Sequence, residues 1–81
     1  MKIKVRYFAL YQDLLGKKGE SVEMPEGTSL KDLVDQILGS HPQRERFLAF
    51  TRFAVNREYA PLSQFLNEGD EIAFLPPVAG G

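Results

Sequence analysis

The stretch that decides the fold is SLKDLVDQILG, residues 29–39. Its apolar residues recur at intervals of three and four, which gives a helix one continuous apolar stripe. Thr28 or Ser29 can cap this helix, and Asp32 completes a capping box if Ser29 is the cap. Gly39 is a typical residue for its C-terminal stop. A helix of this kind has to cover the apolar face of another layer, so the rest of the chain is expected to supply a sheet.

Four other segments have the composition of strands, with apolar residues tending to alternate: residues 2–8, 20–24, 51–56 and 71–75. Residues 9–15 lie before Gly16 and are expected to form a short helix. The first two strands then form a hairpin with an expanded loop. Residues 43–50 fit either a short helix or an irregular segment.

Residues 59–65 contain Pro61 and are interpreted as an irregular connection with a helical turn. The residues of this region that are expected to pack inward are Leu62, Phe65 and Leu66. The predicted fold class is α+β, with one mixed sheet packed against one main helix. A β-grasp fold is the smallest familiar arrangement of this kind. The domain is expected to span residues 1–75, followed by an extended tail at residues 76–81.

Composition excludes several classes of function. The chain has 81 residues, a net charge of −1 and no basic block, so nucleic-acid binding has no electrostatic support. Its apolar stretches are too short to span a bilayer, and a cytoplasmic location is the default expectation. The chain has no cysteine, and His41 is its only histidine. We therefore expect no metal site and no cofactor bound by this chain.

The C-terminal stretch FLPPVAGG, residues 74–81, carries the chemical prediction. Two prolines end sheet pairing and send the chain outward, and two glycines leave only backbone and a carboxylate. Terminal Gly-Gly arises by chance in about one chain in two hundred, and a frayed tail is the alternative interpretation. The residues expected to enter a narrow channel are Pro76, Pro77, Val78, Ala79 and Gly80. The carboxylate of Gly81 is the predicted working group.

A carboxylate is a poor acyl donor and has to be activated, most simply as an acyl-adenylate. This chain offers no site for ATP, Mg²⁺ or the nucleophile, so a partner has to supply them. A docking surface is predicted from strand parity, since Phe8 and Leu75 are large apolar residues on otherwise polar or small faces. They lie together if the first and last strands are neighbours, and Tyr59 is a candidate third member. Alternatively, Phe8 tucks under the loop that follows it.

The chain resembles a known family over essentially its whole length. The segments that carry the resemblance are Val5–Ala9 (VRYFA), Ala54–Asn56 (AVN) and Gly69–Gly81 (GDEIAFLPPVAGG). The family is the small sulfur-carrier subunit of molybdopterin synthase. The chain departs from the family's common pattern at residues 11–13, where an Arg-Glu pair is frequent. It also departs at Tyr59, where a smaller apolar residue is found as well.

The resemblance implies a ubiquitin-like β-grasp fold and a defined cycle of reactions. An adenylyltransferase similar to ubiquitin-activating enzymes would adenylate Gly81, using ATP and Mg²⁺. A sulfur donor system would convert it to a thiocarboxylate, which would donate sulfur to the pterin precursor of molybdopterin. The large catalytic subunit would bind the carrier in a heterotetramer, and Phe8, Tyr59 and Leu75 match the family's contact surface. The chain would not be catalytic alone.

Three other functions remain open at this point. A sulfur carrier of thiamine biosynthesis has the same Gly-Gly end, but is usually shorter and lacks the Tyr-Phe-Ala opening. A ubiquitin-like protein modifier would join Gly81 to lysines through isopeptide bonds. A plain β-grasp interaction module would have an inert tail.

Overall fold

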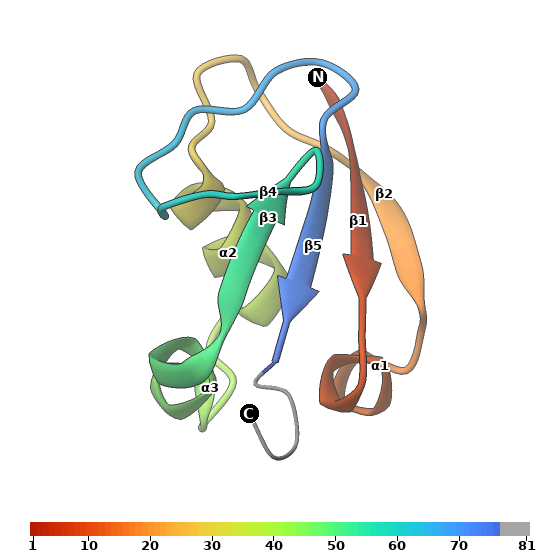
Figure 1. Cartoon of the computed structure of the whole chain (residues 1–81), viewed down its shortest axis with the longest axis vertical. Coiled ribbons are helices and arrows are strands. Elements are labelled where there is room, and N and C mark those ends of the chain that lie inside the picture. Colours follow the sequence, from red (N-terminus) through yellow and green to blue (C-terminus); the bar gives the residue numbers. More distant parts are fainter. Residues whose placement is uncertain (77–81) are drawn as a thin grey trace.

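The computed structural model describes residues 1–76 and contains one sheet and three helices (Figure 1). The helices are α1 (Leu10–Leu15), α2 (Leu30–Leu38) and α3 (Arg44–Phe50). The strands are β1 (Lys2–Tyr7), β2 (Gly19–Glu23), β3 (Arg52–Val55), β4 (Glu58–Tyr59) and β5 (Glu71–Leu75). The sheet order is β2-β1-β5-β3-β4. β1 and β5 are parallel and the other neighbours are antiparallel, so the sheet is mixed. This is the predicted β-grasp arrangement.

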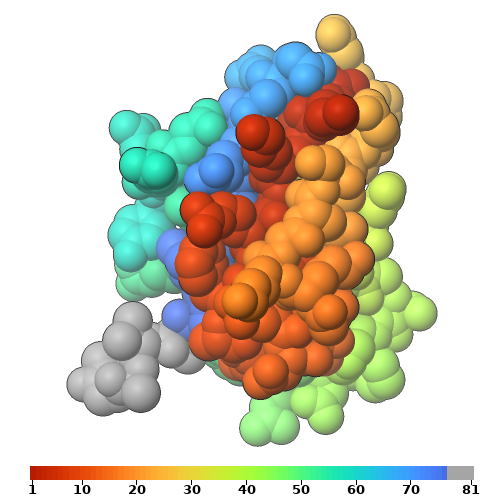
Figure 2. Space-filling view, turned by 90° about the vertical axis from the view of Figure 1, so that its right-hand side faces the viewer, coloured from red at the N-terminus to blue at the C-terminus, as the bar shows by residue number. Residues whose placement is uncertain are grey.

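One face of the sheet packs against α2, and Figure 1 shows this helix behind the strands. The fully or almost fully buried side chains of this layer come from alternate strand positions and from the apolar stripe of α2: Ile3, Val5, Tyr7, Leu30, Leu33, Val34, Ile72 and Phe74. Figure 2 looks onto the sheet edge, with α2 (yellow-green) on one side and the β3–β4 hairpin (turquoise) on the other. The apolar residues on this inner face of the sheet, the face that packs against α2, are therefore explained by the hydrophobic core.

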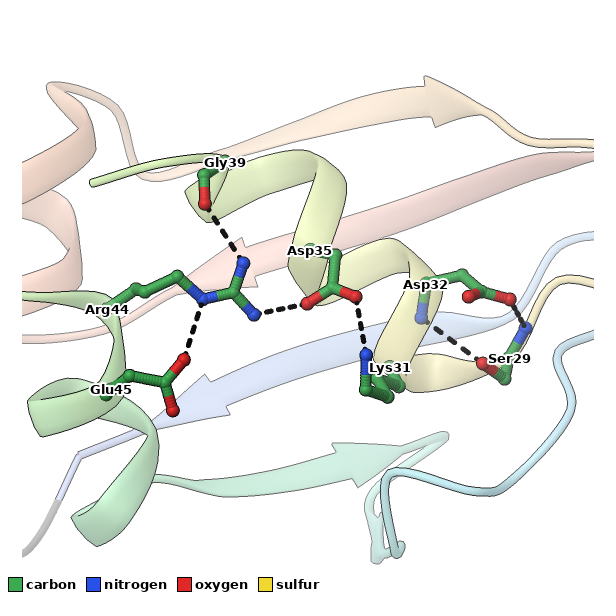
Figure 3. A network of polar contacts seen from close by, with 7 residues as sticks. All are labelled: Ser29, Lys31, Asp32, Asp35, Gly39, Arg44 and Glu45. Carbon is green, nitrogen blue, oxygen red and sulfur yellow. Dashed lines mark hydrogen bonds and ion pairs between the residues drawn. The ribbon is translucent and has the colours of Figure 1, made fainter. Parts of the chain in front are cut away.

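The predicted cap of α2 is confirmed, and Ser29 is the N-cap residue (Figure 3). The backbone N–H of Asp32 donates to the Ser29 hydroxyl at 3.2 Å, and the Ser29 N–H donates to the Asp32 carboxylate at 3.1 Å. These two bonds satisfy two N–H groups that a helix start otherwise leaves without partners. Gly39 follows the helix, as the sequence predicts.

Residues 43–50, which the sequence left open, form α3. The guanidinium of Arg44 donates to Asp35 on α2, and at 3.0 Å to the carbonyl of Gly39 (Figure 3). Lys31 extends the network with a 2.8 Å ion pair to Asp35. The first turn of α3 is thus tied to the last turn of α2. Within residues 1–76, no helix combines the length and hydropathy of a membrane-spanning segment.

One inward-packing prediction is wrong. Leu66 is buried and Leu62 is half-buried, but Phe65 is 68% exposed. Phe65 pairs with Ser29 in an isolated bridge, so the local chain is extended there. Neighbouring residues of an extended chain point to opposite sides, and Leu66 takes the inward position.

Candidate functional site

The end of β5 lies beside an exposed apolar surface on the face of the sheet opposite α2. Tyr7 on β1 is paired with Phe74 on β5, and both side chains are buried in the core. The next residues, Phe8 and Leu75, therefore point to the opposite face, side by side. Phe8 is 36% exposed and Leu75 is half-buried. The predicted neighbouring of the first and last strands is confirmed.

Tyr59 reaches the same face from β4, a two-residue strand that the sequence did not predict. Ala54 on β3 is opposite both Tyr59 on one side and Ala73 on the other. These three residues form one row across the sheet. Tyr59 is 70% exposed, whereas Ala54 is buried. We call the surface formed by Phe8, Ala54, Tyr59, Ala73 and Leu75 the outer patch.

The outer patch is hollow at its centre, with a cavity volume of about 290 Å³. The depression forms because two alanines lie between larger side chains. Its lining consists of the outer patch and three charged residues: Arg6, Arg57 and Glu71. A partner side chain can enter such a depression and lose contact with water there, which is typical of binding surfaces.

Arginines surround the outer patch, and the sequence analysis did not single them out. The Arg6 guanidinium lies 5.6 Å from the centre of the Phe8 ring, and that of Arg52 lies 5.4 Å from the Tyr59 ring. Both distances fall in the range of cation–π contacts. Strand parity could have found Arg6, which alternates with the buried residues of β1, whereas Arg52 is the exposed first residue of β3, whose other residues are buried.

The β3–β4 hairpin that carries Tyr59 is locked to the start of β5. The Asn56 amide donates to the carboxylate of buried Asp70 at 2.9 Å, and its carbonyl accepts from the Glu71 N–H at 3.0 Å. Asn56 and Arg57 both have positive φ, 53° and 71°, as the tight hairpin turn requires. Asparagine tolerates this conformation better than most residues. The lock therefore holds Tyr59 in the outer patch and Arg57 beside it.

The other end of β5 is braced by α1 and α3. The Tyr11 side chain of α1 is fully buried, with its ring centre 5.3 Å from that of Phe74 and 6.1 Å from that of Phe47 on α3. Its hydroxyl is hydrogen-bonded to that of Thr51, which donates at 2.6 Å to the Phe47 carbonyl. The point where the chain leaves the sheet is thus fixed against both short helices.

The predicted tail lies mostly outside the described residues. Pro76 is described and half-buried, directly after β5. The other five residues assigned to the tail lie beyond the described part: Pro77, Val78, Ala79, Gly80 and Gly81. Their predicted roles, and the boundary between residues 1–75 and 76–81, stay predictions. Within residues 1–76 there is no group of three or more residues of the types His, Cys, Asp and Glu that could hold a metal ion.

The described groups with shifted pKa values do not line the hollow. Burial raises the pKa of Tyr7, and so does the nearby carboxylate of Glu20, which accepts a 2.6 Å hydrogen bond from the Tyr7 hydroxyl. The same bond lowers the pKa of Glu20. Lys31 and Arg44 lower the pKa of Asp35 on the helical layer. The outer patch offers apolar contact and fixed positive charge, which suit the binding of another protein surface.

Comparisons with known proteins agree with this geometry. The sequence profile of the ThiS family matches residues 5–81. The molybdopterin synthase sulfur carrier subunit of Mycobacterium tuberculosis is 39% identical over 82 residues, covering 100% of this chain and 99% of the relative.

Two solved structures are also similar. SAMP1 from Haloferax volcanii aligns with a TM-score of 0.85 at 26% identity, and all of both chains is covered. A protein complex of subunits 1 and 2 of the molybdopterin-converting factor from Helicobacter pylori contains a chain that aligns with a TM-score of 0.68 at 28% identity, again with full coverage of both. The chain therefore belongs to the ThiS family and, within it, to the small sulfur-carrier subunits of molybdopterin synthase.

Proposed function

We propose that this chain carries sulfur on Gly81 and donates it to the pterin precursor during molybdopterin synthesis. The observation that carries the proposal is the position of the outer patch beside the end of β5. A partner that covers the patch is placed next to Pro76, from which the tail continues. The relative from Mycobacterium tuberculosis is named as a molybdopterin synthase sulfur carrier subunit, which supports the same role.

The chemistry follows from the carboxylate. An adenylyltransferase partner would transfer the AMP group of ATP to Gly81, with Mg²⁺ bound to the nucleotide and pyrophosphate released. A donor at the oxidation level of sulfide would then displace AMP and leave a thiocarboxylate. The chain has no cysteine, so no side-chain thiol of its own competes as the carrier of the sulfur.

The large catalytic subunit is the proposed receiver of the sulfur. In the Helicobacter pylori structure, subunits 1 and 2 of the molybdopterin-converting factor form a protein complex. We propose an equivalent contact here, made by Phe8, Tyr59 and Leu75. The tail, with Pro76, Pro77, Val78, Ala79 and Gly80, would enter the active site of the large subunit, and two carriers would flank a dimer of large subunits. This chain supplies sulfur and is not catalytic alone.

Intact-mass spectrometry tests the proposal. We expect incubation with the cognate adenylyltransferase, ATP, Mg²⁺ and a sulfur donor to add the mass of one oxygen-to-sulfur exchange. A variant that lacks Gly81 is the matched control, since it should fold and bind the large subunit but gain no sulfur. An unchanged mass of the wild-type chain under these conditions would contradict the proposal.

A role as a protein modifier is the second candidate, and the structural likeness to SAMP1, a small archaeal modifier protein, favours it. Both functions begin with activation of a terminal glycine, so adenylation does not separate them. The product of the next step separates the two functions. Conjugates joined to lysine side chains in cell extract would support the modifier, and sulfur transfer to a pterin by the large subunit would support the carrier. A sulfur carrier of thiamine synthesis would transfer sulfur without that subunit.

A further inference from the structure

Three arginines lie at the margin of the outer patch, one on β1 and two on the β3–β4 hairpin. Arg6 comes from β1, Arg52 from β3, and Arg57 from the β3–β4 turn. All three are exposed. Arg6 and Arg57 line the hollow. The Arg52 guanidinium lies against the aromatic ring of Tyr59. We call these three arginines the basic rim.

The basic rim has no acidic partner among the described residues. Four ion pairs occur within residues 1–76, and they join lysines and an arginine elsewhere: Lys17–Glu20, Lys31–Asp35, Arg44–Asp35 and Arg44–Glu45. The hollow is lined by one carboxylate, that of Glu71. The face is thus positive on a chain whose net charge is −1. This concentration of charge is not needed to balance the chain's own acidic residues.

The contacts of the basic rim leave its donors available to another molecule. The cation–π attraction between a guanidinium and an aromatic ring uses none of the N–H groups of the arginine as hydrogen-bond donors to the protein. Arginine is also weakly hydrated and binds carboxylates through two parallel hydrogen bonds. The contacts with the Phe8 and Tyr59 rings therefore hold two of the three arginines in place for a carboxylate partner.

We propose that the basic rim selects a partner surface with an apolar centre and carboxylates around it, and that the large subunit presents this surface. This inference rests on the proposed function, and it specifies in addition that the surface of the partner is negatively charged around the contact. The apolar hollow between the arginines favours a protein over a nucleic acid, which would require a continuous basic track. Charges at the rim of an interface mainly raise the association rate, and salt screens them.

The test is the association rate with the large subunit, measured by stopped-flow mixing over a series of salt concentrations. The wild-type rate constant is expected to fall on the order of tenfold from low to physiological ionic strength. The triple variant Arg6→Gln, Arg52→Gln, Arg57→Gln should associate more slowly at low salt and respond weakly to added salt. Circular dichroism checks that the variants fold.

Single variants sharpen the result. Arg57→Gln removes a charge from the hollow without removing either of the two ring contacts described above. Lys18→Gln is the matched control, because Lys18 is exposed and precedes β2, at the opposite edge of the sheet from β4. Arg57→Gln should slow association, and Lys18→Gln should not.

Two results would overturn the inference while leaving the proposed function intact. One is a wild-type association rate that does not depend on salt, and the other is a triple variant that associates as fast as the wild type. In both cases the carrier still binds. A wild-type chain that does not bind the large subunit at all would overturn the proposed function, and this inference with it.

Discussion

The two faces of the sheet are made by the same strands, but their apolar residues have different roles. On the inner face, Tyr7 and Phe74 are buried in the core and contact each other edge to face, with ring centres 5.4 Å apart. On the outer face, one residue further along each strand, Phe8 and Leu75 remain in contact with solvent. The inner apolar residues are explained by the core. The outer ones contribute little to the buried core, and we propose that a partner surface covers them.

The largest effect is expected on the inner face. The Phe74 ring makes edge-to-face contacts with Tyr7, Tyr11 and Phe53, and the side chain is fully buried. Phe74→Ala should lower the free energy of unfolding by about 3–5 kcal/mol, because it leaves a cavity where three rings meet. Denaturant titration measures this, and Phe74→Leu gives a smaller loss if the alanine variant does not fold.

The matched control for that variant is Phe65→Ala. The Phe65 side chain is 68% exposed, so its removal should change the free energy of unfolding by less than about 0.5 kcal/mol. Equal stability of the two alanine variants would contradict the claim that the buried Phe74 ring stabilises the fold and the exposed Phe65 ring does not.

The next effect concerns binding. Tyr59→Ala should weaken binding to the large subunit by about 2 kcal/mol, or roughly thirtyfold, because an exposed tyrosine beside a hollow is a typical anchor of an interface. Stability should hardly change, since the ring is 70% exposed. Calorimetric titration gives the affinity and denaturant titration gives the stability. Unchanged affinity would remove Tyr59 from the contact surface.

Loss of the hydrogen bonds that lock the β3–β4 hairpin to β5 is expected to lower stability moderately. Asn56→Ala removes two hydrogen bonds and places alanine at a φ of 53°, which should cost roughly 1–2 kcal/mol of stability. Asn56→Gly removes the same bonds but accepts the backbone conformation. The glycine variant should therefore be the more stable of the two in thermal unfolding. Equal stability would show that the backbone conformation contributes little.

The smallest effect is a pH dependence at the edge strand β2. The pKa of Glu20 is lowered below its ordinary value of 4.5, chiefly by the hydrogen bond from Tyr7 and also by Lys17. A lowered pKa in the folded state means that this stabilisation is fully present above pH 4.5 and is lost as pH falls through the lowered pKa. The contribution is expected to be less than about 1 kcal/mol, because Glu20 is partly exposed.

The variant Glu20→Gln isolates this contribution. Its amide oxygen can still accept from the Tyr7 hydroxyl, but it does not titrate. The stability difference between wild type and variant should therefore shrink below pH 4.5. A difference that stays constant from neutral to acidic pH would contradict the assigned hydrogen bond.

The sequence predicted the elements whose pattern is local. α2 has a regular apolar stripe and a capping box, and β1 and β5 alternate clearly, so these three elements and their exposed residues could be predicted. α3 could not, because its N-cap residue, Gln43, makes no side-chain capping bond and the helix has no buried residue. Its stability comes from tertiary contacts such as the ion pair between Arg44 and Asp35.

The outer patch was predicted only in part, for a similar reason. Phe8 and Leu75 stand out in the sequence because each breaks a local alternation. Tyr59 was only a candidate, since β4 has two residues and depends on its pairing with β3. The basic rim joins Arg6 to Arg52 and Arg57, which are far apart in the sequence, and only the order of the strands brings them together.

The most direct test of the account is a map of the face that the large subunit covers. The labelled chain is titrated with the large subunit, and the changes in its NMR signals are assigned to residues. The account predicts that the changes concentrate on Phe8, Ala54, Tyr59, Ala73 and Leu75, while the exposed side of α2 is unaffected. Changes centred on α2, with the outer patch unperturbed, would contradict it.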